Sequence, residues 1–173
     1  VAGMLSQNLL NLVDTAMVGA LGPTALAAVG IGSYANFMAI ALFIGLGSGV
    51  QAMVARREGE GRREMTAVPL NGGLLLSVAL GLPTLAVLFV LAPDFMPLIT
   101  PAPAVTAEGT PYFQARLVGV VAVGMTFAFR GYWNGVNLPQ IHFQVLLVTH
   151  LSNIVINYVL IFGALGFPAL GTL

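Results

Sequence analysis

The chain has 173 residues, of which 58% are hydrophobic and 7% are charged, and its net charge at pH 7 is zero. Soluble domains carry roughly 25% charged residues, so this chain has too few to cover a water-facing surface, and its composition predicts a membrane protein. Without a basic face, nucleic-acid binding has no electrostatic basis. Without cysteine, disulfides and thiolate metal sites are excluded.

Five apolar segments reach the roughly 20 residues that a helix needs to cross about 30 Å of hydrocarbon. We expect an all-α membrane protein, a polytopic bundle with helices at about 1–20, 24–55, 67–92, 111–134 and 141–163. The chain as a whole, residues 1–173, reads as one membrane unit. An odd number of spans predicts a truncated six-helix bundle, most of one half of a transporter built from two halves, and the chain is expected to begin inside its first helix.

The connections between these segments carry turn and loop chemistry. The stretch 56–64 is a polar loop with seven charges in nine residues, and the stretch 92–111 contains five prolines. Proline-rich sequence is typical of irregular connections, so we expect no more than a short surface helix in 92–111. Gly135 to Gln140 predicts a short turn.

The arginines set the orientation of the bundle. Four lie in the loop 56–64, and Arg130 lies on the same side, near the end of the fourth segment. The loops on the other side carry Asp94 and Glu108, with only Arg116 nearby. The excess of arginine predicts that the loop 56–64 is cytoplasmic.

Asp14 is a carboxylate inside an apolar helix. Such a group costs about 2.5–3.5 kcal/mol at bilayer depth, so it predicts a proton or cation site, or part of a substrate path. Asn11 lies three residues before Asp14, and Gln7 lies four residues before Asn11. These spacings place all three side chains on one helix face. That face must meet other helices or a wet cavity. Alternatively, the two amides only join helices, at about 0.6 kcal/mol per hydrogen bond.

The fifth segment repeats this pattern with His150, Asn153 and Asn157, again on one face. If the two faces meet, Asp14 gains amide donors and an imidazole, and its carboxyl can change protonation near neutral pH. His150 is then a second titrating group or, alternatively, a hydrogen-bonded core histidine. His142 lies about 12 Å from His150 along the helix, too far to share a metal ion. No metal site, cofactor or catalytic constellation is predicted, so we expect no enzyme.

Two smaller motifs have structural interpretations. Gly45 and Gly49 lie in an apolar helix with no strand before them, so they predict close helix packing rather than a nucleotide loop. Tyr132 and Trp133 suit an aromatic belt at the membrane interface, and Arg130 can extend to the headgroups.

At this point the sequence resembles the multidrug and toxic compound extrusion (MATE) transporters. The stretch 11–22, Asn-Leu-Val-Asp-Thr-Ala-Met-Val-Gly-Ala-Leu-Gly, followed by Ala-Leu-Ala-Ala-Val-Gly at 25–30, is similar to the family's first helix and the start of its second. The stretch 55–59 is similar to the loop that ends the second helix. Phe129-Arg130-Gly131 with Asn134-Gly135, and later 153–157, are similar to the fourth and fifth helices.

The resemblance implies twelve helices in two six-helix lobes, of which this chain would supply most of the N-terminal lobe. It implies a cation-coupled antiporter of the bacterial inner membrane that exports organic cations or drugs in exchange for H⁺ or Na⁺, with the missing second lobe as its partner. Asp14 matches the family's coupling acid, and Gln7, Asn134 and Asn153 match residues lining the cavity. Asn157 stands where some members carry a second Asp, which calls a relay through two carboxylates into question.

Two other functions compete with this reading. A lipid-linked precursor flippase of related architecture needs basic residues for a pyrophosphate headgroup, whereas these helices show only Arg116 and Arg130, both near helix ends. A non-transporting membrane subunit would use Asp14 only to pair with an Arg on a partner helix.

Overall fold

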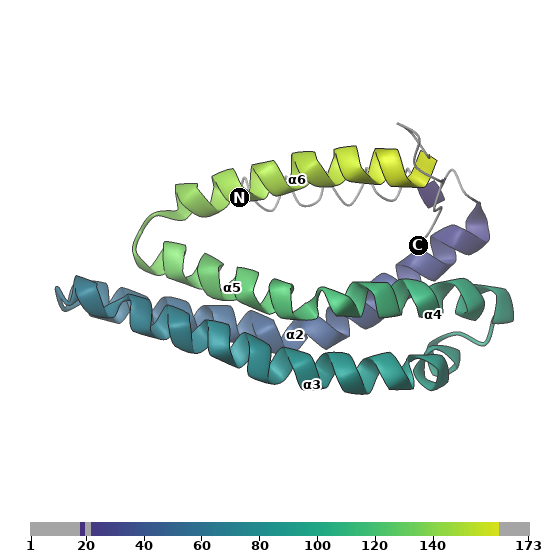
Figure 1. The fold of residues 1–173 in the computed structure, drawn as a ribbon, viewed down its shortest axis with the longest axis horizontal. Coiled ribbons are helices and arrows are strands. Elements are labelled where there is room, and N and C mark those ends of the chain that lie inside the picture. Colours follow the sequence, from purple (N-terminus) through teal and green to yellow (C-terminus); the bar gives the residue numbers. More distant parts are fainter. Residues whose placement is uncertain (1–17, 20–21, 163–173) are drawn as a thin grey trace. The chain divides into compact units, whose positions relative to one another are not determined.

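A computed structural model of the chain describes residues 18–19 and 22–162, with side chains described to residue 156. These residues form α-helices and contain no β-strand (Figure 1). The helices are α2 (Pro23–Gly59), α3 (Ala67–Ile99), α4 (Pro103–Val118), α5 (Val120–Gly135) and α6 (Pro139–Phe162), with a 3₁₀ helix η1 (Arg63–Met65) between α2 and α3. The predicted all-α fold is confirmed.

The length and surface of the helices suit a bilayer. In the described part of the chain, α2 and the stretch Arg63–Ile99 are each 37 residues long and apolar enough to cross a membrane. The bent pair α4 and α5 together would make a third span. On α3, Leu75, Val90 and Leu98 are 72%, 73% and 84% exposed. Large apolar side chains on the outside match a hydrocarbon solvent, and the chain is an integral membrane protein.

The proline-rich stretch differs from its expected structure. α3 continues to Ile99, past the end expected near residue 92, and α4 begins at Pro103 rather than near residue 111. Proline at the first turn of a helix loses no hydrogen bond, because the first N–H groups have no partner within the helix. Pro111 lies inside α4, and membrane helices tolerate such positions. The helix is interrupted instead at Gly119, whose N–H donates to the Arg116 carbonyl at 3.1 Å.

The chain divides into two compact units. Among the described residues, the first combines 18–34, apart from 20 and 21, with Ala92–Ala115 and 143–162, and the second combines Ala35–Leu91 and Arg116–His142. In the described part of the first unit, the buried apolar side chains include Ala28, Met96 and Phe113. The rings of Phe95 and Phe113 pack with centroids 6.2 Å apart.

The second unit is held together by small residues on α5. Gly124, Ala128, Gly131 and Gly135 are all buried, and α5 runs alongside α2 and α3 (Figure 1). A Cβ at Gly124 would lie 2.6 Å from the Phe43 ring of α2 and 3.1 Å from Ser77 of α3. Small side chains let membrane helices approach closely, where lipid offers no hydrophobic drive for association.

Gly45 and Gly49 do not take part in this packing. No heavy atom lies within 4 Å of a Cβ built at either position, so the prediction that they mediate close packing is wrong for the described residues. Gly47, between them, packs instead against Phe127 of α5. A Cβ built at Gly47 would lie 2.8 Å from the Phe127 carbonyl oxygen. Gly47 is two residues from Gly45 and two residues from Gly49. A step of two residues along an α-helix leads to a different face, so Gly47 does not share the face of the other two.

The helices α2 and α5 end with the same local structure. After α2, the Arg62 N–H donates to the Arg57 carbonyl at 2.9 Å and the Gly61 N–H donates to the Glu58 carbonyl at 3.0 Å. Gly61 has a φ of 73°, in the left-handed region. This pattern is a Schellman motif, in which a left-handed residue lets the chain satisfy the last helical carbonyls.

The corresponding left-handed residue after α5 is Asn137, with a φ of 60°. The Leu138 N–H donates to the Trp133 carbonyl at 2.8 Å and the Asn137 N–H donates to the Asn134 carbonyl at 3.2 Å. Between the two motifs, a core cluster joins Val50, Val54 and Ala128 to partly buried neighbours: Leu70, Leu74, Tyr132 and Val136. The loop after α2 and the turn after α5 therefore lie at the same end of the second unit.

Candidate functional site

The residues predicted to form the site are only partly described. Gln7, Asn11 and Asp14 lie outside the described residues. Asn157 belongs to α6, but its side chain is not described. His150 and Asn153 lie together on α6 in the first unit, and Asn134 lies on α5 in the second.

The polar face of α6 is shielded. His150 is 8% exposed, and Asn153, one turn later, is half-buried. Several apolar side chains elsewhere on this helix are open: Val148 and Leu151 are each 65% exposed, and Val155 is 62% exposed. Exposed side chains of this kind suit lipid, whereas His150 and Asn153 are covered by protein. This face is a candidate wall of a transport cavity.

Asn134 has a clear backbone role. It is half-buried in the last turn of α5, and its carbonyl accepts the N–H of Asn137 in the Schellman motif. Its backbone is thereby held beside the turn.

The structure also adds a polar contact that the sequence did not predict. The Ser33 hydroxyl of α2 and the Tyr112 hydroxyl of α4 lie 3.1 Å apart in the first unit. The Tyr112 ring lies over Gly32, where a Cβ would be only 2.6 Å from the ring carbon Cδ1. Ser33 and Tyr112 are 79 residues apart and each is isolated in its own helix, so no spacing pattern indicates the pair. The small residue before Ser33 is the only local signal.

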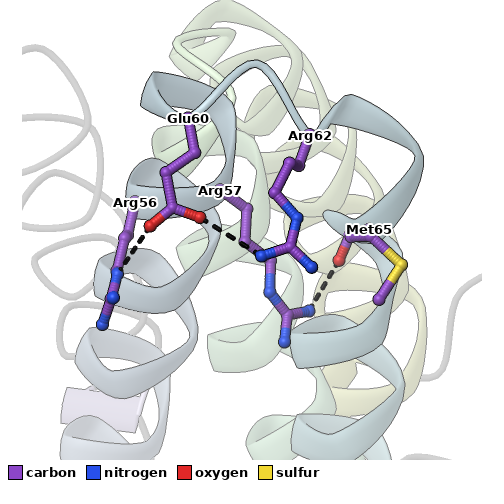
Figure 2. A network of polar contacts seen from close by, with 5 residues as sticks. All are labelled: Arg56, Arg57, Glu60, Arg62 and Met65. Atoms are coloured by element: carbon purple, nitrogen blue, oxygen red, sulfur yellow. Dashed lines mark hydrogen bonds and ion pairs between the residues drawn. The ribbon is translucent and has the colours of Figure 1, made fainter.

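The charged last turn of α2 and the connection after it form a network of polar contacts (Figure 2). The Arg56 Nε donates to the Glu60 carboxylate at 2.9 Å, and Arg62 approaches the other Glu60 oxygen at 3.5 Å. The Arg57 guanidinium donates to the Met65 carbonyl at 2.6 Å. This bond ties the end of α2 to η1 and shapes the connection into α3.

The arginine partners of Glu60 change the pKa of its carboxyl group. The hydrogen bond from Arg56 is the main cause that holds the pKa of Glu60 below its ordinary value of 4.5. A carboxyl whose pKa is lower when folded stabilises the loop at pH values above its unfolded pKa. That contribution is lost as the pH falls through the folded pKa. The pair is exposed, so solvent screening keeps its effect small.

No group of three or more His, Asp or Glu is placed to hold a metal ion in the part of the chain that the structure describes.

The comparison with protein families decides the identity of these helices. Residues 1–159 match the family described as MatE. The chain belongs to the MatE family. The match runs through every predicted site residue from Gln7 to Asn157, and it confirms the resemblance noted from the sequence.

Two bacterial relatives show how much of a MatE protein is present. The chain is 35% identical over 170 residues to a probable multidrug resistance protein NorM from Synechococcus sp.. It is 33% identical over 179 residues to a protein of the same name from Burkholderia pseudomallei. In both cases the match covers 98% of this chain and 36% of the relative. The chain thus spans about a third of the length of the curated relatives that it matches.

Solved structures of the family have the same helical arrangement. One, described as the outward-facing conformation of a multidrug resistance MATE family transporter of the MOP superfamily, has a TM-score of 0.88 at 28% identity, over 98% of this chain and 38% of that one. A MOP superfamily transporter from Pyrococcus furiosus has the same TM-score and identity, over 98% of this chain and 37% of that one. The described helices are therefore part of one lobe of a larger MatE transporter fold.

Proposed function

We propose that this chain forms most of the N-terminal lobe of an antiporter that exports organic cations or drugs by alternating access. Uptake of H⁺ or Na⁺ drives the export. The second lobe would supply the opposite wall of the cavity.

The observation that carries this proposal is the shielded polar face of α6. His150 is buried and Asn153 is half-buried, while the apolar Val148, Leu151 and Val155 of the same helix are open. A helix that served only as an anchor needs no such face, because polar groups at membrane depth are costly unless they meet protein or water. Membership of the MatE family supports the interpretation of this face as a cavity wall.

In the proposed mechanism, Asp14 is the coupling residue. Gln7, Asn11, Asn134, His150, Asn153 and Asn157 line the cavity. When Asp14 is ionised, its charge attracts a cationic substrate. When it takes up a proton or binds Na⁺, that attraction falls and its hydrogen-bond partners change, which biases the packing of the first helix and releases the substrate. Proton and drug therefore compete for one carboxylate.

We further propose that the protein resides in a bacterial inner membrane with the loop 56–64 on the cytoplasmic side. The four arginines of this loop support the orientation through the positive-inside rule. Arg130 lies at the same end of the second unit, beside the turn after α5.

The test is transport by the full-length protein in liposomes. We expect a fluorescent organic cation to move against its gradient when a pH or Na⁺ gradient is imposed, and to stop when an ionophore collapses that gradient. Liposomes without protein provide the control. Dye movement that is indifferent to both gradients would overturn the coupling, and translocation of a fluorescent lipid-linked pyrophosphate instead of the dye would favour the flippase.

A further inference from the structure

The turn between α5 and α6 brings two basic side chains together. Arg130 lies five residues before the end of α5 and is exposed, and His142 lies three residues after the start of α6 and is half-buried. At 1.5 Å per residue, both lie within about 8 Å of the turn along their helices. Burial, and after it the nearby Arg130 cation, holds the pKa of His142 below its ordinary value of 6.5, so the imidazole is mostly neutral at pH 7.

The described chain provides no carboxylate for this pair. The acidic residues of the second unit, Glu58, Glu60 and Glu64, lie in the last turn of α2 or in the connection that follows it. Glu58 and Glu60 pair there with arginines of the same connection. No ion pair among the described residues reaches Arg130, so an anion from outside would pair with its cation.

The surroundings of the pair are those of a membrane interface. Tyr132 and Trp133 pack edge to face beside the turn, with ring centroids 5.1 Å apart. Such aromatic side chains gather at the level of the lipid headgroups. Phe129 and Leu138, also near the turn, are 42% and 38% exposed, and they offer an apolar surface to an acyl chain. A basic pair with apolar surface alongside suits a lipid better than a soluble anion.

We propose that Arg130 and His142 bind the phosphate group of an anionic phospholipid in the cytoplasmic leaflet. The guanidinium of Arg130 can donate two parallel hydrogen bonds to phosphate oxygens, and His142 can donate a third from its ring. A phosphatidylcholine headgroup fits less well, because its ammonium group would meet the Arg130 cation. The site does not depend on what the protein transports.

Trp133 provides the means to test the site, because it is the only tryptophan of the chain. The full-length protein is reconstituted in phosphatidylcholine vesicles that contain brominated phosphatidylglycerol, or brominated phosphatidylcholine for comparison. Bromine quenches the fluorescence of nearby tryptophan. Subtracting the fluorescence of the Trp133→Phe variant isolates the contribution of Trp133. We expect phosphatidylglycerol to be preferred about fivefold, the equivalent of ~1 kcal/mol per basic side chain near an anionic surface.

The variants separate a site from general surface charge. Arg130→Gln should abolish the preference and His142→Gln should reduce it, whereas Arg56→Gln, which removes a charge from the neighbouring loop, should leave it unchanged. Arg130→Lys keeps the charge but loses the paired hydrogen bonds, so it should retain an intermediate preference, and it serves as the second variant if Arg130→Gln fails to fold.

Three results would overturn the proposal. The first is a preference that survives both Arg130→Gln and His142→Gln. The second is an equal loss in Arg56→Gln, since that would indicate general attraction to the membrane surface. The third is full displacement of the brominated phosphatidylglycerol signal by inorganic phosphate, because the ligand would then be a free anion.

Discussion

Gly131 of α5 lies directly against Gly47 of α2, so close that a Cβ at Gly131 would overlap the Gly47 carbonyl oxygen. The next nearest atom, the Gln51 backbone nitrogen, would lie 3.1 Å from that Cβ. Both neighbours are backbone atoms, which cannot rotate away as a flexible side chain can. The approach of α2 and α5 therefore requires that residue 131 have no side chain.

Gly131→Ala should destabilise the protein. Separating two packed helices costs about 1–3 kcal/mol, as other overpacking substitutions do. The matched control is Gly72→Ala, where no heavy atom lies within 4 Å of the new Cβ and better helix propensity should leave stability equal or higher. The measurement is the melting temperature of the purified full-length protein in detergent. Equal melting temperatures for the two variants would show that α2 and α5 do not pack as described.

Substitutions at Asn137 should depend on backbone conformation rather than on side-chain contacts. The left-handed φ of 60° costs a β-branched residue about 1–2 kcal/mol, whereas glycine adopts it freely. Asn137→Val should therefore lower the melting temperature, while Asn137→Gly should leave it unchanged or raise it slightly. If both variants lowered it equally, the Asn137 side chain itself would be stabilising the turn.

Asn153→Leu should impair transport without unfolding the protein. Removing a polar group from the cavity wall should cost about 1.4 kcal/mol of substrate or coupling-ion interaction, or roughly tenfold in efflux rate. The neighbouring Ser152 is exposed, and Ser152→Leu should transport normally because lipid accepts leucine. Efflux of a cationic dye at matched expression levels distinguishes the two variants. An equal loss of efflux in Ser152→Leu would show that the two faces of α6 do not differ in function, and the cavity assignment depends on that difference.

Asp14→Asn in the full-length protein should abolish gradient-driven efflux while the protein still folds. Asparagine is nearly isosteric and avoids burying a charge, so membrane insertion should become easier. It cannot change charge, however, and so cannot couple a proton gradient to a conformational choice. Dye efflux under an imposed pH or Na⁺ gradient is the measurement, with Thr15→Ala as the neighbouring control. Efflux close to the parent level would make Asp14 structural and place the coupling group elsewhere.

Orientation can be tested with one cysteine. Gly59→Cys in a full-length protein that has no other accessible thiol should resist impermeant maleimide in whole cells and react after permeabilisation. Gly59 is exposed, with no heavy atom within 4 Å of a Cβ there, so protection would come from the membrane and not from local packing. Rapid labelling of intact cells would reverse the assigned topology.

The sequence predicted the features that depend on solvent. Few charges and long apolar segments determine that the helices lie in lipid, because each unpaired polar group in hydrocarbon costs several kcal/mol. The same penalty explains why His150, in the predicted polar stripe of α6, is buried. The residues around Asp14, in the stretches 11–22 and 25–30, were the main indication of the MATE transporters, and the family match confirmed that resemblance.

Only the tertiary structure decided which residues meet. Gly45, Gly47 and Gly49 are alike in sequence, yet only Gly47 packs against α5, because two residues along a helix turn the chain to another face. Ser33 and Tyr112 come from different helices, and no local pattern records the approach of two helices. Composition and periodicity determine the environment of each helix, whereas contacts between helices depend on how several surfaces fit at once.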